Sequence, residues 1–277
     1  MKPRSHGGRS KTHALGQNFL IDVDVAVRIV EAAHVNPEEY VMEVGPGRGI
    51  LTHLLAETGA TILAVEKDPQ LAAALIPQFA SYKNVTIVVG DILQFDYQGY
   101  FGTKNFSIVA NLPYSVGTLA TRIFLEAPKK PNRMILMLQK EVAERMTAQP
   151  PHMSILSHVV AINSEASKLF DVPKEAFQPM PKVTSSVLSF TPRKEGLVTL
   201  EEYEPLLRLM KAGFSNKRKT LENALSGSLH LSKEAVRDIL QSAHISNTLR
   251  AEALELKNWK DLKEILREKP SISQGTK

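Results

Sequence analysis

A glycine-rich turn and a later acid are the residues best suited to bind a nucleoside. The segment 43–49 reads EVGPGRG; it follows a short apolar run and opens a helix-like stretch. Gly45 and Gly47 let the backbone turn tightly and approach a ligand, while the helix N-terminus presents unpaired N–H groups. Glu66 stands at the end of the next apolar run. A carboxylate in that place can accept hydrogen bonds from both hydroxyls of a ribose.

The spacing of these glycines distinguishes between ligands. The turn reads G-x-G-x-G, whereas nicotinamide and flavin enzymes use G-x-G-x-x-G to seat a pyrophosphate. S-adenosylmethionine has no pyrophosphate and carries an amino acid group and a sulfonium, so the turn favours this methyl donor over NAD. Asp91 and Ile92 end the third apolar run and are expected beside the adenine of this donor. Asp91 would accept a hydrogen bond from the exocyclic amine. Helix capping is the alternative role for Glu66 and Asp91.

The four residues after the fourth apolar run indicate the reaction. Asn111, Leu112, Pro113 and Tyr114 resemble the N/D-P-P-Y/F signature of enzymes that methylate an exocyclic amine on a base. The Asn111 side-chain carbonyl and a main-chain carbonyl near Leu112 can both accept hydrogens from such an amine, which aims its lone pair at the sulfonium methyl. Positioning then supplies most of the catalysis. Pro113 fixes the backbone and Tyr114 offers a stacking face; an ordinary turn is the alternative.

A second aromatic side chain begins the segment 177–185, which reads FQPMPKVTS. Phe177 is expected to cover the other face of the base, because bases outside a duplex are held between aromatic or apolar side chains. Packing in the core is the alternative role for this ring.

The elements that must position these residues alternate between strands and helices. Five apolar runs predict strands covered on both faces, and the stretches between them predict helices, as in a doubly wound α/β sheet. With two later strands this gives a mostly parallel seven-stranded sheet over a domain 1–192. The rest, 193–277, has helical spacing throughout and predicts a small all-helical domain. The strands are 41–45, 61–66, 85–89, 106–110, 134–138, 164–170 and 183–190; the helices are 50–58, 69–80, 116–126 and 139–148, then 201–213, 217–225, 232–241 and 250–267.

Charge and composition restrict the partners and the compartment. The 277 residues carry a net charge of +5, with four basic side chains and no acid in 1–13 and 16 basic against 12 acidic side chains in 193–277. Such segregation favours a polyanion partner. Cysteine is absent, which excludes disulfides and thiolate metal sites. No metal, membrane span or secretory signal is expected, so we predict a cytoplasmic protein, monomeric by default, with disordered tails at 1–13 and 270–277.

The motifs together resemble one family. QNFL at 17–20, the glycine turn, Glu66, Asp91, the tetrapeptide, the segment 177–185 and FSNKRKTL at 214–221 occur in one order. At this spacing the chain resembles the small-subunit ribosomal RNA adenine dimethyltransferases over roughly residues 10–270, which have the class I methyltransferase fold. One departure is QPPHMS at 149–154, where many relatives have a Tyr-Gly or Tyr-Ser pair.

The resemblance implies a substrate and further contacts. The donor is S-adenosylmethionine, held also by Asn18 and Leu20. The acceptors are two adjacent adenines in the loop of the last helix of the small-subunit RNA, within a nearly assembled subunit. Each adenine receives two methyl groups on its exocyclic nitrogen. Lys217, Arg218 and Lys219 are assigned to RNA phosphates, with a solvated helix face as the alternative.

Three other readings remain open at this point. A large-subunit adenine methyltransferase of the macrolide-resistance type shares the fold and the tetrapeptide, so only 177–185 and 214–221 argue against it. A non-catalytic nucleic-acid-binding relative is disfavoured by the intact tetrapeptide. A nicotinamide oxidoreductase is disfavoured by the glycine spacing.

Overall fold

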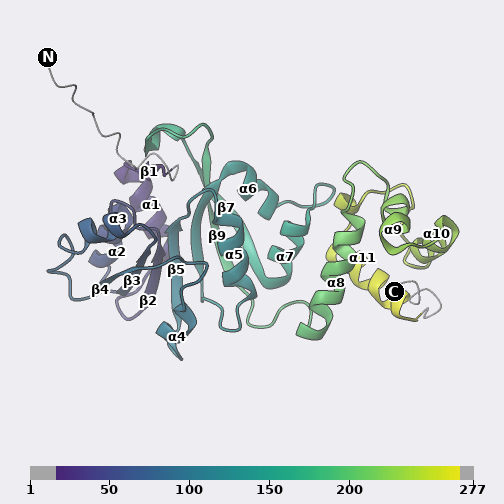
Figure 1. Ribbon diagram of the computed structural model, residues 1–277, viewed down its shortest axis with the longest axis horizontal. Coiled ribbons are helices and arrows are strands. Elements are labelled where there is room, and N and C mark those ends of the chain that lie inside the picture. The colour runs from purple at the N-terminus through teal and green to yellow at the C-terminus, as the bar shows by residue number, and fades with distance from the viewer. Residues whose placement is uncertain (1–16, 269–277) are drawn as a thin grey trace, which may run out of the picture. The chain divides into compact units, whose positions relative to one another are not determined.

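A seven-stranded sheet is the frame of this computed structural model, which describes residues 17–268 (Figure 1). The strand order is β4-β3-β2-β5-β6-β9-β7, and the pairs β4–β3, β3–β2, β2–β5 and β5–β6 are parallel. This confirms the predicted α/β class with a mostly parallel seven-stranded sheet. The strands are β2 (Tyr40–Val44), β3 (Thr61–Glu66), β4 (Val85–Val89), β5 (Phe106–Asn111), β6 (Met134–Gln139), β7 (Ser164–Val172) and β9 (Ser185–Pro192).

Burial explains why these runs form strands. The central strands β2, β5 and β6 are buried at almost every position, as the continuous apolar runs require when both faces of a sheet are covered. The edge strand β4 has only half-buried and exposed positions. The sheet therefore has its most apolar strands at its centre.

The helices that follow these strands lie close to the predicted ranges, except that the range 69–80 was wrong at its end: the helix stops at Leu75, because Pro77 disfavours its continuation. The helix α2 (Ile50–Glu57) packs on β3, and α3 (Pro69–Leu75) packs on β4. Later helices of the same kind are α5 (Gly117–Glu126) and α6 (Lys140–Met146). Helices not predicted from the sequence are α1 (Val23–Ala33), α4 (Tyr97–Phe101) and α7 (Ile155–Asn163). A two-stranded antiparallel sheet of β1 (Phe19–Leu20) and β8 (Phe177–Gln178) was also not predicted.

The C-terminal part is helical, as predicted, although two helices start later than expected. The helices are α8 (Leu200–Gly213), α9 (Leu221–Leu229), α10 (Lys233–Ser242) and α11 (Leu256–Glu268). The range 217–225 was wrong at its start because the Thr220 side chain caps α9, and residues 215–219 form the preceding loop. The range 250–267 was wrong at its start, because residues 251–253 form a separate short 3₁₀ turn and α11 begins at Leu256. The helices share a core of apolar side chains that includes Trp259, Leu206 and Met210.

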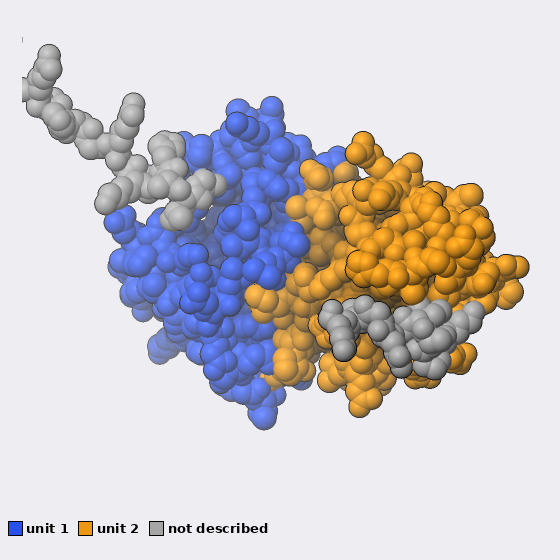
Figure 2. All heavy atoms as spheres, turned by 45° about the vertical axis from the view of Figure 1, so that its right-hand side comes forward, with its two compact units in different colours: residues 1–120, 134–140, 169–187 blue, residues 121–133, 141–168, 188–277 orange. Residues whose placement is uncertain are grey.

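The described chain forms two compact units, coloured separately in Figure 2. The first holds the described residues up to 120 with 134–140 and 169–187; the second holds 121–133, 141–168 and the described residues from 188 onward. Because β7 and β9 each contribute to both units, the division at 192–193 stays a prediction. The tails 1–13 and 270–277 lie outside the described residues, and within 17–268 no helix has both the length and the apolar character to cross a membrane.

Candidate active site

The glycine turn lies in the first unit, between the end of β2 and the start of α2. Gly45, Gly47 and Gly49 have φ angles of 68°, 59° and 84°, a conformation that costs other residues energy. A Cβ atom at Gly47 would lie 3.0 Å from the Phe19 ring. Any side chain at this position would therefore press on the segment that covers the turn.

Glu66 braces this turn from the end of the neighbouring strand β3. Its side chain is buried, with Oε2 accepting from the Gly47 N–H at 3.0 Å and Oε1 accepting from the Asp68 N–H at 2.9 Å. A carboxylate has about four lone-pair sites, so two hydrogen bonds leave acceptor capacity. The carboxylate is thus fixed in the cleft wall and can still accept hydrogen bonds from hydroxyl groups.

Asp91 lies after β4 and is held in its ionised form. Its Oδ2 is 2.7 Å from the Lys67 Nζ, and its Oδ1 accepts from the Leu93 N–H at 3.1 Å. The hydrogen bond with Lys67, with that from the Leu93 backbone, lowers the pKa of Asp91. Lys67 also lines the cleft and was missed in the sequence, where its only signal is its place directly after Glu66.

Glu43 is a second residue that sequence reasoning missed. It lies on β2, lines the cleft and is 1 % exposed, and its Oε2 has no hydrogen-bond partner within residues 17–268. Burial raises its pKa to about 8, and the negative charge of Glu66 acts in the same direction. This side chain is therefore a neutral acid at neutral pH. Its signal in the sequence was an acid inside an otherwise apolar strand.

The tetrapeptide continues directly from β5. Asn111 is the last residue of that strand, and the Leu112 N–H donates to the Met137 carbonyl at 3.2 Å, which ties the turn to β6. Tyr114 is half-buried, and its hydroxyl lies 2.9 Å from the Ser185 Oγ. Burial raises the pKa of Tyr114, so the phenol stays neutral.

The N-terminal segment forms the other wall of the cleft. Phe19 lies beneath the Arg48 guanidinium, whose carbon is 4.7 Å from the ring centroid. Leu20 is buried in the core, and Asn18 precedes the strand. From Asn18 to Tyr114, every residue predicted for the donor or the amine therefore lines one cleft.

Among the residues predicted to contact the acceptor base, Phe177 does not line this cleft. It is 3 % exposed and packs in the core with Val172 and Ala176. The reason is its register in β8, which pairs it with Leu20, another core residue. The ring therefore packs in the core in this structure, and the stacking role of Phe177 stays a prediction.

The basic run lies in the second unit, in the loop between α8 and α9. Lys217, Arg218 and Lys219 are all exposed, and none has an ion pair within the described part of the chain. The Asn216 side-chain oxygen and carbonyl accept from the backbone N–H groups of Arg218 and Lys219, each at 3.1 Å. These residues therefore lie on a fixed loop, and not on the helix face considered above.

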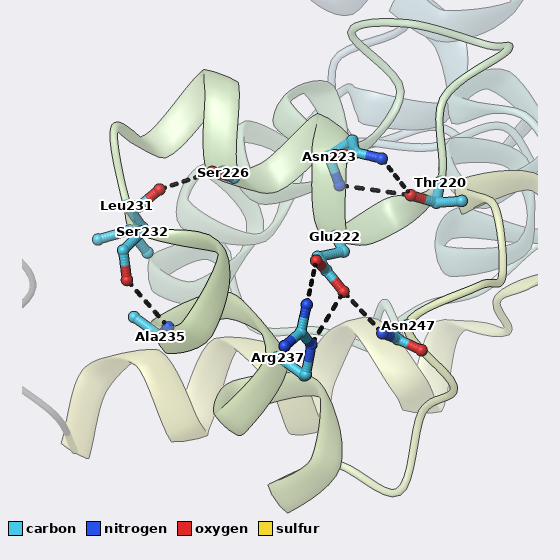
Figure 3. A network of polar contacts seen from close by, with 9 residues as sticks. All are labelled: Thr220, Glu222, Asn223, Ser226, Leu231, Ser232, Ala235, Arg237 and Asn247. Carbon is cyan, nitrogen blue, oxygen red and sulfur yellow. Dashed lines mark hydrogen bonds and ion pairs between the residues drawn. The ribbon is translucent and has the colours of Figure 1, made fainter.

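A buried acid on α9, the helix that follows this loop, joins parts of the second unit (Figure 3). Glu222, which is 7 % exposed, accepts from Arg237 at 3.0 and 3.4 Å and from the Asn247 amide at 2.7 Å. These contacts join α9 to α10 and to the loop that follows α10.

The loop 149–152, part of the segment that departs from the family pattern, lies in the same unit. A hydrogen bond from the His152 N–H to the Gln149 carbonyl at 2.8 Å closes it.

Comparisons with known proteins match most of the chain. The chain is 38 % identical over 257 residues to the ribosomal RNA small subunit methyltransferase A of Dehalococcoides mccartyi, covering 92 % of this chain and 88 % of the relative. It is 37 % identical over 271 residues to the protein of the same name from Latilactobacillus sakei, covering 94 % and 91 %.

Two solved structures share the fold. A dimethyladenosine transferase from Plasmodium falciparum superposes with a TM-score of 0.77 at 22 % identity, covering 92 % of this chain and 98 % of its own. The 23S rRNA methyltransferase ErmE gives 0.72 at 26 % identity, covering 90 % and 100 %. A sequence model of the family described as ribosomal RNA adenine dimethylase matches residues 8–267, and the chain belongs to that family.

Proposed function

We propose that this protein transfers methyl groups from S-adenosylmethionine to the exocyclic N6 of two adjacent adenines in the loop of the 3′-terminal helix of 16S ribosomal RNA. Each adenine becomes N6,N6-dimethyladenosine. The observation that carries the proposal is one cleft that holds the glycine turn, Glu66 and the tetrapeptide together. Its curated relatives at 37–38 % identity are named for the small subunit.

The donor end of the cleft fits a nucleoside with a charged tail. In the proposal Glu66 accepts the ribose hydroxyls, because its carboxylate is already oriented by Gly47 and Asp68. Asp91 and Ile92 contact the adenine, and the ionised Asp91 suits an amine donor. Gly45 has no side chain, so the donor can approach the backbone closely there. Asn18 and Leu20 line the opposite wall of the cleft. When bound, the donor supplies an electrophilic methyl on its sulfonium.

The acceptor end acts by positioning. In the proposal the Asn111 side-chain oxygen and the Leu112 carbonyl oxygen accept hydrogen bonds from the N6 amine. These hydrogen bonds make the nitrogen lone pair available to attack the methyl group. Pro113 restricts the backbone between these two residues and Tyr114, on which the base stacks. Each transfer forms one N–C bond, breaks one C–S bond and releases one proton, so no strong base is needed.

The proposal includes the setting of the reaction. The exposed loop Lys217–Lys219 contacts RNA phosphates, and the acceptor is a late-assembly small ribosomal subunit. The protein works as a monomer in the cytoplasm, without a metal. These statements extend the family assignment, and the polyanion partner agrees with the basic loop and the net charge of +5.

Methyl transfer to isolated subunits tests the proposal. We expect label from a methyl-labelled donor to reach small subunits that lack the modification and not large subunits. The Asn111→Ala variant sets the background. Transfer to large subunits alone would move the protein to the macrolide-resistance type. Transfer to neither subunit, with RNA still bound, would make it a non-catalytic relative.

A further inference from the structure

The segment 173–185 is attached at both of its ends to walls of the cleft. At its start the Ala176 carbonyl accepts from the Ile21 N–H at 2.9 Å, and β8 pairs with β1. At its end the Ser185 Oγ meets the Tyr114 hydroxyl at 2.9 Å. The segment therefore connects the strand beside the glycine turn with the aromatic ring of the tetrapeptide.

The contact at Ser185 is built into the core of the first unit. Ser185 is 0 % exposed and is the first residue of β9. Tyr114 is only half-buried, and its sequence neighbours Pro113 and Ser115 are exposed. The backbone fixes one end of the tyrosine, and the buried serine fixes the other. A neutral phenol, which burial favours here, can donate this hydrogen bond.

We propose that Ser185 is a positioning residue for methyl transfer: it holds the ring of Tyr114 in the orientation in which the acceptor base stacks on it. This inference rests on the proposed function, because it requires Tyr114 to contact the base. Ser185 itself does not line the cleft. It acts only through the tyrosine, so its loss affects the reacting complex and leaves donor binding unchanged.

The adjacent serine provides a matched control. Ser186 is also 0 % exposed and also forms a side-chain hydrogen bond, from its Oγ to the Asp171 Oδ1 at 2.7 Å. Successive residues of a strand point to opposite faces, so Ser186 points away from the Tyr114 side. Replacing either serine by alanine removes one buried hydroxyl, but only Ser185→Ala releases the tyrosine.

A double-mutant cycle on methyl transfer separates positioning from stability. We measure kcat and KM for small subunits, donor Kd and thermal unfolding for Ser185→Ala, Tyr114→Phe, the double variant and Ser186→Ala. One lost hydrogen bond is expected to lower kcat about tenfold in both single variants. Because the two groups share one contact, the double variant should be no slower than either single variant. Donor Kd and the kcat of Ser186→Ala should stay at the wild-type values.

Several outcomes would overturn this inference. Additive losses in the double variant would mean that Ser185 does not act through Tyr114. An equal loss in Ser186→Ala would mean that any buried hydroxyl of this strand has the same effect, and that Ser185 has no specific role in positioning. If Ser185→Ala does not fold, Tyr114→Phe decides alone, since it leaves the core intact: wild-type kcat would show that the tether is dispensable. Tyr114→Ala distinguishes the two proposals. Full transfer by that variant would remove Tyr114 from the proposed site, whereas inactivity of the wild type would refute the function itself.

Discussion

Asn111 occupies the place where a small change in geometry has the largest effect on the proposed reaction. It ends β5 at the edge of the sheet where the glycine turn and Glu66 also lie. The amine of adenine is a poor nucleophile because its lone pair is delocalised into the ring. A hydrogen-bond acceptor that fixes this amine is therefore worth far more in the transition state than in binding.

Replacing Asn111 by alanine should lower kcat by about 100-fold to 1,000-fold, the usual cost of one preorganised polar group. Donor Kd should change much less. Methyl transfer to small subunits and donor titration measure the two effects. Asn105→Ala is the matched control, because Asn105 is exposed and precedes the opposite end of the same strand. Unchanged turnover in Asn111→Ala would remove this residue from the reaction.

Glu43 makes the stability of the protein depend on pH. Its folded-state pKa of about 8 lies above the ordinary 4.5, so ionisation is costlier in the folded state than in the unfolded state. The wild type should therefore lose stability as pH rises from 4.5 to 8, by on the order of a few kcal/mol. Glu43→Gln removes this loss over that range. Denaturant unfolding at several pH values checks it.

The control for this prediction is Glu57→Gln, which changes an exposed acid at the end of α2. Its pH profile should follow that of the wild type. A Glu43→Gln profile parallel to the wild type would show that the buried carboxyl does not titrate in this range.

At the scale of elements, local patterns predicted the sheet and the helices that follow its strands, because a glycine or a polar residue ends each apolar run. Buried apolar runs closed by Gly45, Glu66 or Asn111 mark the same edge of the sheet, so the sequence predicts that these residues share one site. The helix α1 was missed although Asp22 caps it and a buried stripe follows at Val25 and Ile29.

Other features had no local signal. The pairing of β1 with β8 joins two-residue strands that lie far apart in the chain, so no periodicity announces it. That pairing decides the position of Phe177, whose aromatic type fits a stacking role and a core role equally well. The Ser185–Tyr114 contact joins residues 71 positions apart, so it too has no local signal.

Among the helices of the second unit, a buried histidine gives a separate acid dependence. His158 on α7 is 0 % exposed, its Nε2 accepts from the Trp259 indole on α11 at 3.2 Å, and its Nδ1 has no partner within the described range. Burial lowers its pKa from 6.5 to about 4. Stability from neutral His158 should be complete above pH 6.5 and fall towards pH 4, by at most about 3 kcal/mol.

Unfolding by denaturant at pH 7 and pH 5 measures this loss, which His158→Gln should reduce because the amide does not titrate. His152→Gln, which changes an exposed histidine, should leave the loss as in the wild type. Equal losses in the wild type and His158→Gln would contradict the assignment.

At the scale of the whole molecule, charge decides how RNA is attracted. The net charge is +5, and three of the basic residues follow one another on the loop before α9. Each phosphate neutralised by a protein cation releases counterions, so RNA affinity falls with salt in proportion to the number of such contacts.

Removing Lys217 and Lys219 together should weaken RNA binding and flatten the plot of log affinity against log salt by roughly 1.5 to 2 units, the share of two phosphate contacts. Binding to small subunits across a salt series measures this slope. Lys83→Ala with Lys194→Ala removes the same charge from two exposed lysines elsewhere in the sequence. If both pairs flatten the slope equally, the attraction comes from net charge alone. A change confined to the first pair assigns it to this loop, because only contacts at the interface release counterions.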